Sequence, residues 1–296
     1  MTMVLAAAGF ALFAWWASTG LILALDRLPR ATFPWTMAGA TLLTGFALAG
    51  LAWSAGETSV ASAWCAFACA LVVWGWTEVS FLTGWITGPR RTASPPGTRG
   101  LTRLGHAVAA IIYHELAILA GFVVVLAISW GGENQTATLT YGVLWAMRLS
   151  AKINIFLGVP NHADGFLPDH LAYLKSWFTR KPMNVFFPVS VSAALVVLVL
   201  VALPAVSADA SAFEAASATL VATLLALAVL EHWFLVLPFE SITLWRIGAG
   251  GSATRTPSEP PREPKSTPLH APAPAPVARP APAMDDDKHA YSLWRR

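Results

Sequence analysis

Long runs of apolar residues, separated by short polar connections, fill most of the chain. A helix needs about 20 mainly apolar residues to cross the roughly 30 Å hydrocarbon core of a bilayer. Seven runs reach that length, at residues 3–25, 35–53, 60–86, 107–130, 139–159, 185–206 and 213–237. The pattern predicts an all-α integral membrane protein with seven transmembrane helices.

The basic residues indicate which side of the membrane each connection faces. Lys and Arg gather in the connections after runs one, three and five and in the chain beyond run seven, whereas the connections after runs two, four and six contain none. Cytoplasmic connections carry the excess of Lys and Arg in membrane proteins. We therefore expect a periplasmic N-terminus and a cytoplasmic C-terminus. The first basic residue is Arg27, so the first run lacks the basic start of a signal peptide and is expected to remain as a span.

The composition excludes several classes of protein. Hydrophobic residues make up 56% of the chain and charged residues only 12%, whereas an average soluble domain has about 25% charged residues. This excludes a cytosolic globular enzyme, and two cysteines are too few for a disulfide scaffold. The sequence has no phosphate-binding loop, no serine nucleophile motif and no nucleic-acid-binding module. We therefore expect neither an enzyme nor a nucleic-acid partner.

Two segments differ from the transmembrane domain, which we place at residues 1–246. Residues 247–296 are rich in Pro and Ala and lack apolar periodicity, which predicts a disordered cytoplasmic tail. Residues 167–180 repeat apolar residues at helical spacing, at Leu167, Leu171, Leu174 and Phe178. We expect an amphipathic helix there, lying either along the inner leaflet or against the cytoplasmic ends of the helix bundle.

Ionisable residues inside the predicted spans are the main candidates for function. Each costs about 2.5–3.5 kcal/mol in mid-bilayer on insertion scales, so each needs a partner or a role. The candidate set is Glu78, His114, Glu115, Arg148, Lys152, Glu231 and His232. At about 1.5 Å per residue, the three carboxylates and Lys152 lie roughly 9–12 Å inside the predicted cytoplasmic edge, with Arg148 about a turn deeper. Groups at a common depth can pair, so we expect this polar layer to neutralise itself.

Four roles are open for the polar layer. It can clamp four helices together through ion pairs, bind a polar headgroup or cofactor, conduct protons or ions, or hold a metal. A metal centre is least favoured, because adjacent His and Glu residues point about 100° apart on a helix and no HExxH or ExxH motif is present. His114 and His232 are weak candidates for ligating the magnesium of a chlorophyll-type pigment, and we favour a hydrogen bond from each to a nearby Glu. Cys65 and Cys69 share one helical face and are interpreted as packing residues.

Six stretches of the chain carry a family resemblance. They are WGWTEVSFLTGWITGPRR (74–91), YHELA (113–117), MRLSAKINIFLGVPN (147–161), FLPDHLAYL (166–174), RKPMNVFFPVSV (180–191) and LEHWFLVLP (230–238). Together they resemble the PuhE-type photosynthetic complex assembly proteins of purple bacteria, over residues 12–245. The resemblance implies a multi-pass protein of the bacterial inner (intracytoplasmic) membrane. Such a protein assists assembly of the reaction-centre and light-harvesting complex and influences bacteriochlorophyll supply.

The resemblance also implies partners. Reaction-centre and light-harvesting subunits or pigment-synthesis proteins are expected, besides membrane lipids, and bacteriochlorophyll is the candidate cofactor. No catalytic residue is implied. Two alternative functions stay open: a carrier of bacteriochlorophyll or of a precursor, and a membrane enzyme or transporter that uses the polar layer.

Overall fold

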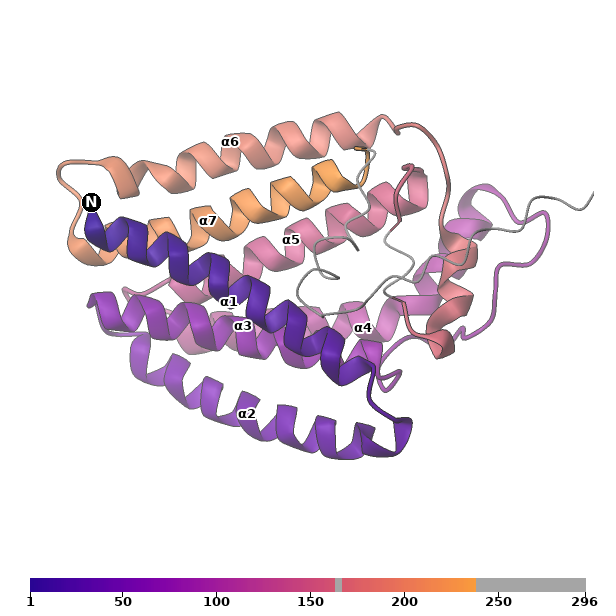
Figure 1. Cartoon of the computed structure of the whole chain (residues 1–296), viewed down its shortest axis with the longest axis horizontal. Helices are drawn as coiled ribbons and strands as arrows, with labels where there is room; N and C mark the ends of the chain where they lie inside the picture. The colour runs from indigo at the N-terminus through magenta and orange to yellow at the C-terminus, as the bar shows by residue number, and fades with distance from the viewer. Residues whose placement is uncertain (163–166, 238–296) are drawn as a thin grey trace, which may run out of the picture. The chain divides into compact units, whose positions relative to one another are not determined.

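Seven long α-helices make up most of the part of the protein that the structure describes. The computed structural model describes residues 1–162 and 167–237 (Figure 1). The α-helices are α1 (Thr2–Asp26), α2 (Phe33–Ser54), α3 (Val60–Leu82), α4 (Gly100–Ser129), α5 (Thr136–Leu157), α6 (Phe186–Val206) and α7 (Ala212–Phe234). Short 3₁₀ helices are η1 (Arg30–Thr32) and η3 (Asp169–Trp177), and no strand occurs within the described residues. The predicted tail at 247–296 lies outside them.

Six of the α-helices, all except α5, are long and apolar enough to cross a membrane. The regular structure of the described residues is therefore all helical, and its six apolar helices are those of a multi-pass membrane protein. The 22 residues of α5 would extend about 33 Å, which is the length of a span. Polar side chains, among them Arg148, Lys152 and Asn154, lower its hydropathy. The predicted total of seven spans consequently depends on how the charges of α5 are neutralised.

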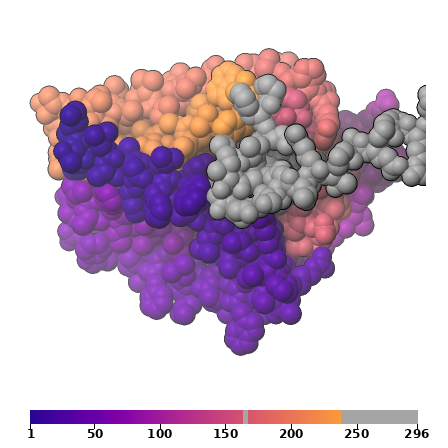
Figure 2. Space-filling view, in the orientation of Figure 1, coloured from indigo at the N-terminus to yellow at the C-terminus, as the bar shows by residue number. Residues whose placement is uncertain are grey.

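The helices α3 and α7 occupy the centre of the bundle. In each of them 56% of the most apolar stretch is buried, against 6–17% in the other four apolar helices. Both α3 and α7 pack against α1 and α5, and α2 and α6 cover their outer sides. Much of the surface visible in Figure 2 belongs to the outer helices. Large apolar side chains such as Leu42, Phe46 and Leu200 are exposed on them, as is expected of a surface in contact with lipid.

Both central helices begin with a capping box. The Ser59 hydroxyl accepts a hydrogen bond from the Ser62 backbone N–H, and the Ser211 hydroxyl accepts one from the Glu214 N–H. The Glu214 carboxylate in turn accepts a bond of 2.7 Å from the Ser211 N–H. These reciprocal bonds satisfy backbone donors that a helix start would otherwise leave unpaired. They fix where the two central helices begin.

The boundary between α3 and α4 differs from the apolar pattern. The third apolar run was predicted to continue to residue 86, but α3 ends at Leu82 because Gly84 adopts a φ of +79°, a left-handed conformation that ends helices. The fourth run was predicted to begin at residue 107, but α4 begins at Gly100. Its extra turns are polar, and Arg103 there donates to the Trp177 carbonyl oxygen at 2.6 Å. Tertiary contacts therefore extend α4 beyond its apolar run.

The amphipathic segment predicted at 167–180 is a 3₁₀ helix of nine residues, Asp169–Trp177, and not an α-helix. Its buried residues Leu171, Leu174 and Trp177 recur every third position, which lines up one face of a helix with three residues per turn. They pack against Phe81 of α3 and Ala110 of α4. The two predicted placements were along the inner leaflet and against the ends of the helix bundle. The buried face of η3 lies against the ends of the bundle.

Candidate functional site

Two ion pairs connect α5 to its neighbours. Arg148 Nη2 lies 3.2 Å from Glu78 Oε2 of α3, and Lys152 Nζ lies 2.6 Å from Glu115 Oε1 of α4. The two cations are four residues apart on α5, and therefore share one face of that helix. Four of the seven candidate residues thus lie in two oppositely charged pairs, and α5 presents no unpaired cation among them.

His232 of α7 joins α5 through a hydroxyl. Its Nε2 lies 2.9 Å from Ser150 Oγ, and its Nδ1 lies 2.8 Å from the Ala228 carbonyl oxygen, so both ring nitrogens are engaged. The preceding residue, Glu231, forms no ion pair with a described residue, although the Trp15 side chain of α1 lies within hydrogen-bonding reach of it. Glu231 is therefore the least neutralised carboxylate of the polar layer.

His114 is enclosed in the bundle. The residue is fully buried, and its ring stacks on Phe81 with ring centroids 4.3 Å apart. Neither ring nitrogen has a hydrogen-bond partner within residues 1–162 and 167–237. Its backbone N–H donates to the Thr87 carbonyl oxygen at 3.0 Å, which ties the α3–α4 connection to α4. The contacts of His114 are those of a packed ring.

The prediction that each of the two histidines forms a hydrogen bond with a nearby glutamate is wrong. Among the described residues, His114 does not bond Glu115, and His232 bonds Ser150 and a backbone carbonyl instead of Glu231. Sequence neighbours on a helix project about 100° apart, so each Glu turns toward a different surface from its His. The same rotation places Glu115 opposite Lys152.

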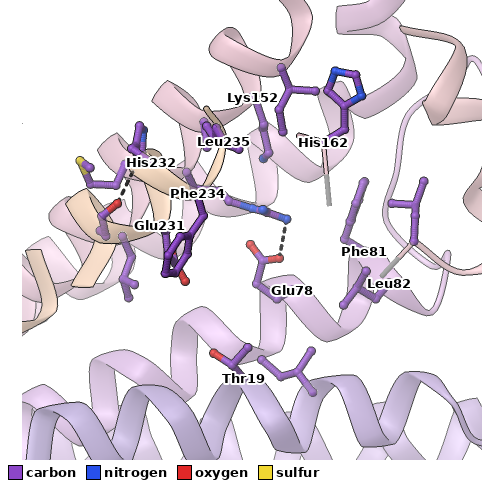
Figure 3. Close-up of a pocket in the computed structure, with 18 of the residues that line it drawn as sticks. Thr19, Glu78, Phe81, Leu82, Lys152, His162, Glu231, His232, Phe234 and Leu235 are labelled. Atoms are coloured by element: carbon purple, nitrogen blue, oxygen red, sulfur yellow. Dashed lines mark hydrogen bonds and ion pairs between the residues drawn. The ribbon is translucent and has the colours of Figure 1, made fainter. Parts of the chain in front are cut away.

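A cavity of about 490 Å³ lies beside the polar layer. Its charged, imidazole and amide lining comes from separate helices and from the segment after α5: Glu78, Arg148, Lys152, Glu231, His232, Asn161 and His162. Figure 3 shows Glu78, Lys152 and Glu231 around this space, with the ion pair to Glu78 as a dashed line. The remaining walls are mainly apolar, and include Trp15 and Phe234. Such a cavity can hold the polar end of an amphipathic molecule at the charged side chains and its apolar part against the walls.

Two polar residues of this cavity were not found from the sequence. Asn161 donates a hydrogen bond of 2.9 Å to the Phe234 carbonyl oxygen and another to that of Leu237, at the end of α7. His162 Nε2 lies 2.8 Å from the Thr179 carbonyl oxygen. Both residues follow α5 directly after Pro160. The sequence signal that could have identified them is an adjacent Asn and His just beyond the end of the fifth predicted span.

The two cysteines lie side by side without a disulfide. Cys65 Sγ and Cys69 Sγ are 3.8 Å apart on α3, and both are free. A Cβ added at Gly50 would lie 2.8 Å from Cys69 Sγ, so the thiols fill the space left by this glycine of α2. No group of three or more His, Cys, Asp or Glu side chains suited to a metal ion was found in the described part of the chain.

Comparison with known proteins places the chain in a family. It is 37% identical to the "uncharacterized 30.4 kDa protein in puhA 5′ region" of Rhodobacter capsulatus, over 241 residues that cover 79% of this chain and 86% of that protein. No solved structure matches the chain. The model of the DUF3623 family, described as "protein of unknown function", matches residues 1–256. The chain therefore belongs to the DUF3623 family.

Proposed function

We propose that this protein is a non-enzymatic accessory factor of the bacterial inner (intracytoplasmic) membrane. It assists assembly of the photosynthetic reaction-centre and light-harvesting complex and influences bacteriochlorophyll supply. The observation that carries the proposal is the similarity to the Rhodobacter capsulatus protein named for the puhA 5′ region, a photosynthesis-gene neighbourhood. The six stretches that resemble PuhE-type assembly proteins support it. The expected partners are subunits of the complex or pigment-synthesis proteins.

The proposal includes seven spans, with the N-terminus in the periplasm and the C-terminus in the cytoplasm. In this arrangement α5 is a span whose two cations are neutralised by carboxylates of α3 and α4. Pairing of Arg148 with Glu78 and of Lys152 with Glu115 supports it, because paired charges are far less unfavourable in hydrocarbon than isolated ones.

The contacts of the polar layer favour a clamp over a catalytic centre. Both cations of α5 and two of the three carboxylates are already in pairs. They connect α5 to α3 and α4, the two helices that precede it in the sequence. Such pairs hold the helices in register around the cavity, which leaves the cavity to bind a partner's side chain or an amphipathic molecule.

The histidine contacts do not favour a pigment carrier. An axial ligand of a magnesium pigment needs an unoccupied ring nitrogen that faces an open space. His114 has ring nitrogens without partners among the described residues but is fully buried. His232 lines the cavity, but both of its nitrogens are engaged. These observations support the assembly role over the carrier role.

Gene deletion tests the proposal. In a phototrophic bacterium that carries the gene, deletion should lower the amount of assembled reaction-centre and light-harvesting complex, measured from the absorbance spectra of isolated membranes. The activities of pigment-synthesis enzymes, assayed in the same membranes, should remain. Unchanged complex levels would refute the assembly role.

Complementation of the deletion strain with variant genes then shows whether the polar layer is a structural clamp or a reactive site. Under the clamp interpretation, Glu115→Gln should lower the amount of protein in the membrane and the amount of complex together. If Glu115→Gln instead abolishes complex formation at an unchanged protein level, the polar layer takes part in chemistry or transport. Glu57→Gln, on the exposed connection between α2 and α3, is the matched control and should complement fully.

A further inference from the structure

A second pocket, of about 250 Å³, lies where three connections of the bundle meet. Its walls come from η1 and the start of α2, from the segment that follows α3, and from η3. The polar residues that line it are Arg30, Thr83, Thr87, Arg91, His170 and Tyr173. None of them belongs to the cavity beside the polar layer. The pocket is therefore a separate site.

The charge of this pocket is positive. Arg30 and Arg91 are its charged lining residues, and neither forms an ion pair with a described residue. Burial lowers the pKa of His170, although the hydrogen bond between its Nε2 and the Leu82 carbonyl oxygen, at 2.7 Å, favours the charged ring. Asp169 precedes His170 but does not line the pocket. Two arginines thus line the pocket without an ion-paired carboxylate among the described residues.

Hydroxyl groups add donors beside the two arginines. Thr87 Oγ1 and Tyr173 Oη are both buried and have no hydrogen-bond partner in the described part of the chain. A buried hydroxyl without a partner is unfavourable, and most such groups are satisfied by a bound molecule or water. A Cβ added at Gly84, whose φ is +79°, would lie 3.0 Å from the His170 ring, so this wall of the pocket leaves little room for a side chain.

The pocket lies beside side chains typical of the membrane surface. Trp35 is 77% exposed and Trp85 is 54% exposed, and each follows closely on a pocket residue, Phe33 or Gly84. Tryptophan is enriched where membrane meets water. The apolar side of the pocket is made by Phe33 and Leu171, both buried. A headgroup at this level would meet the arginines while its acyl chains remain in the bilayer.

We propose that this pocket binds a phosphate group, held between Arg30 and Arg91. Guanidinium groups match the oxygens of phosphate with paired, charge-assisted hydrogen bonds. The phosphate can belong to an anionic phospholipid, which the predicted cytoplasmic position and the exposed tryptophans favour, or to free inorganic phosphate. This site does not depend on the proposed assembly role.

The test uses the full-length protein in nanodiscs. Wild type is compared with the double variant Arg30→Gln/Arg91→Gln, and with the control Arg27→Gln/Arg99→Gln. The control removes the same charge from the same two connections, at exposed residues that do not line the pocket. Thermal unfolding is measured in phosphatidylcholine alone, with added phosphatidylglycerol, and in phosphatidylcholine with inorganic phosphate. Phosphatidylglycerol retained after purification is counted by mass spectrometry.

Phosphatidylglycerol should raise the Tm of wild type and control, and the pocket variant should lose that rise and bind the lipid about tenfold more weakly. If inorganic phosphate raises the Tm as far as phosphatidylglycerol does, and only the pocket variant loses the effect, the site takes free phosphate. Equal behaviour of the pocket variant and the control overturns the proposal. If the double variant does not fold, Arg91→Gln against Arg99→Gln gives the same comparison.

Discussion

Replacing both members of the Lys152–Glu115 pair should destabilise the protein by less than the sum of the two single replacements. The atoms are 2.6 Å apart, and the two side chains are only 18% and 19% exposed, so water cannot replace the lost partner. Breaking a buried pair typically costs about 3–5 kcal/mol, because one charge stays buried and alone. We expect that loss for Glu115→Gln and for Lys152→Met. The double variant should lose less than the sum of the two, with a coupling of about 2 kcal/mol or more.

Unfolding by denaturing detergent in mixed micelles, followed by the fluorescence of the 14 tryptophans, measures these differences. Glu57→Gln, which removes an exposed carboxylate, should change stability by less than about 0.5 kcal/mol. The Arg148–Glu78 pair should give a smaller coupling, because the Arg148 side chain is 41% exposed. Strictly additive losses for Glu115→Gln and Lys152→Met would show that the two groups do not interact, and would refute the clamp.

Three further substitutions test the packing in the same unfolding assay. Gly121→Ala should destabilise by about 1–3 kcal/mol, because its Cβ would lie 2.3 Å from the Tyr141 hydroxyl oxygen; a neutral result would contradict this packing. Ser211→Ala should cost about 1 kcal/mol through loss of the capping box of α7, whereas Ser207→Ala, outside the box, should cost nothing measurable. His114→Leu should change stability by less than about 1 kcal/mol, because it removes no hydrogen bond found in the described residues; a loss above about 2 kcal/mol would reveal a partner for the ring.

Much of the helical pattern could be predicted from the sequence, because span length and charge exclusion are strong constraints. The predicted sixth run, at 185–206, lies within one residue of α6 (Phe186–Val206). The third run was overextended because hydropathy does not register a backbone conformation such as that of Gly84. Likewise, the spacing of Leu171, Leu174 and Trp177 fits a 3₁₀ helix, but the wider apolar pattern favoured an α-helix.

The candidate site was only partly predictable. Counting residues from span ends gives depth along the membrane normal, and it placed Glu115 and Lys152 at a similar level. It gives no information on how each helix is rotated or which helices are neighbours. That is why the partners of His114 and His232 were predicted wrongly. Both pockets depend on where side chains leave space, which a single sequence does not encode in any local pattern.

The placement of both cations on α5 has a consequence for synthesis of the protein. If α5 is a span, as we propose, this least apolar of the long helices carries two charges into the membrane that are unfavourable in lipid alone. The carboxylates that pair with these charges, Glu78 and Glu115, lie on α3 and α4, which are synthesised before α5. In the proposed arrangement, each carboxylate is therefore available in the membrane before the cation that pairs with it is inserted.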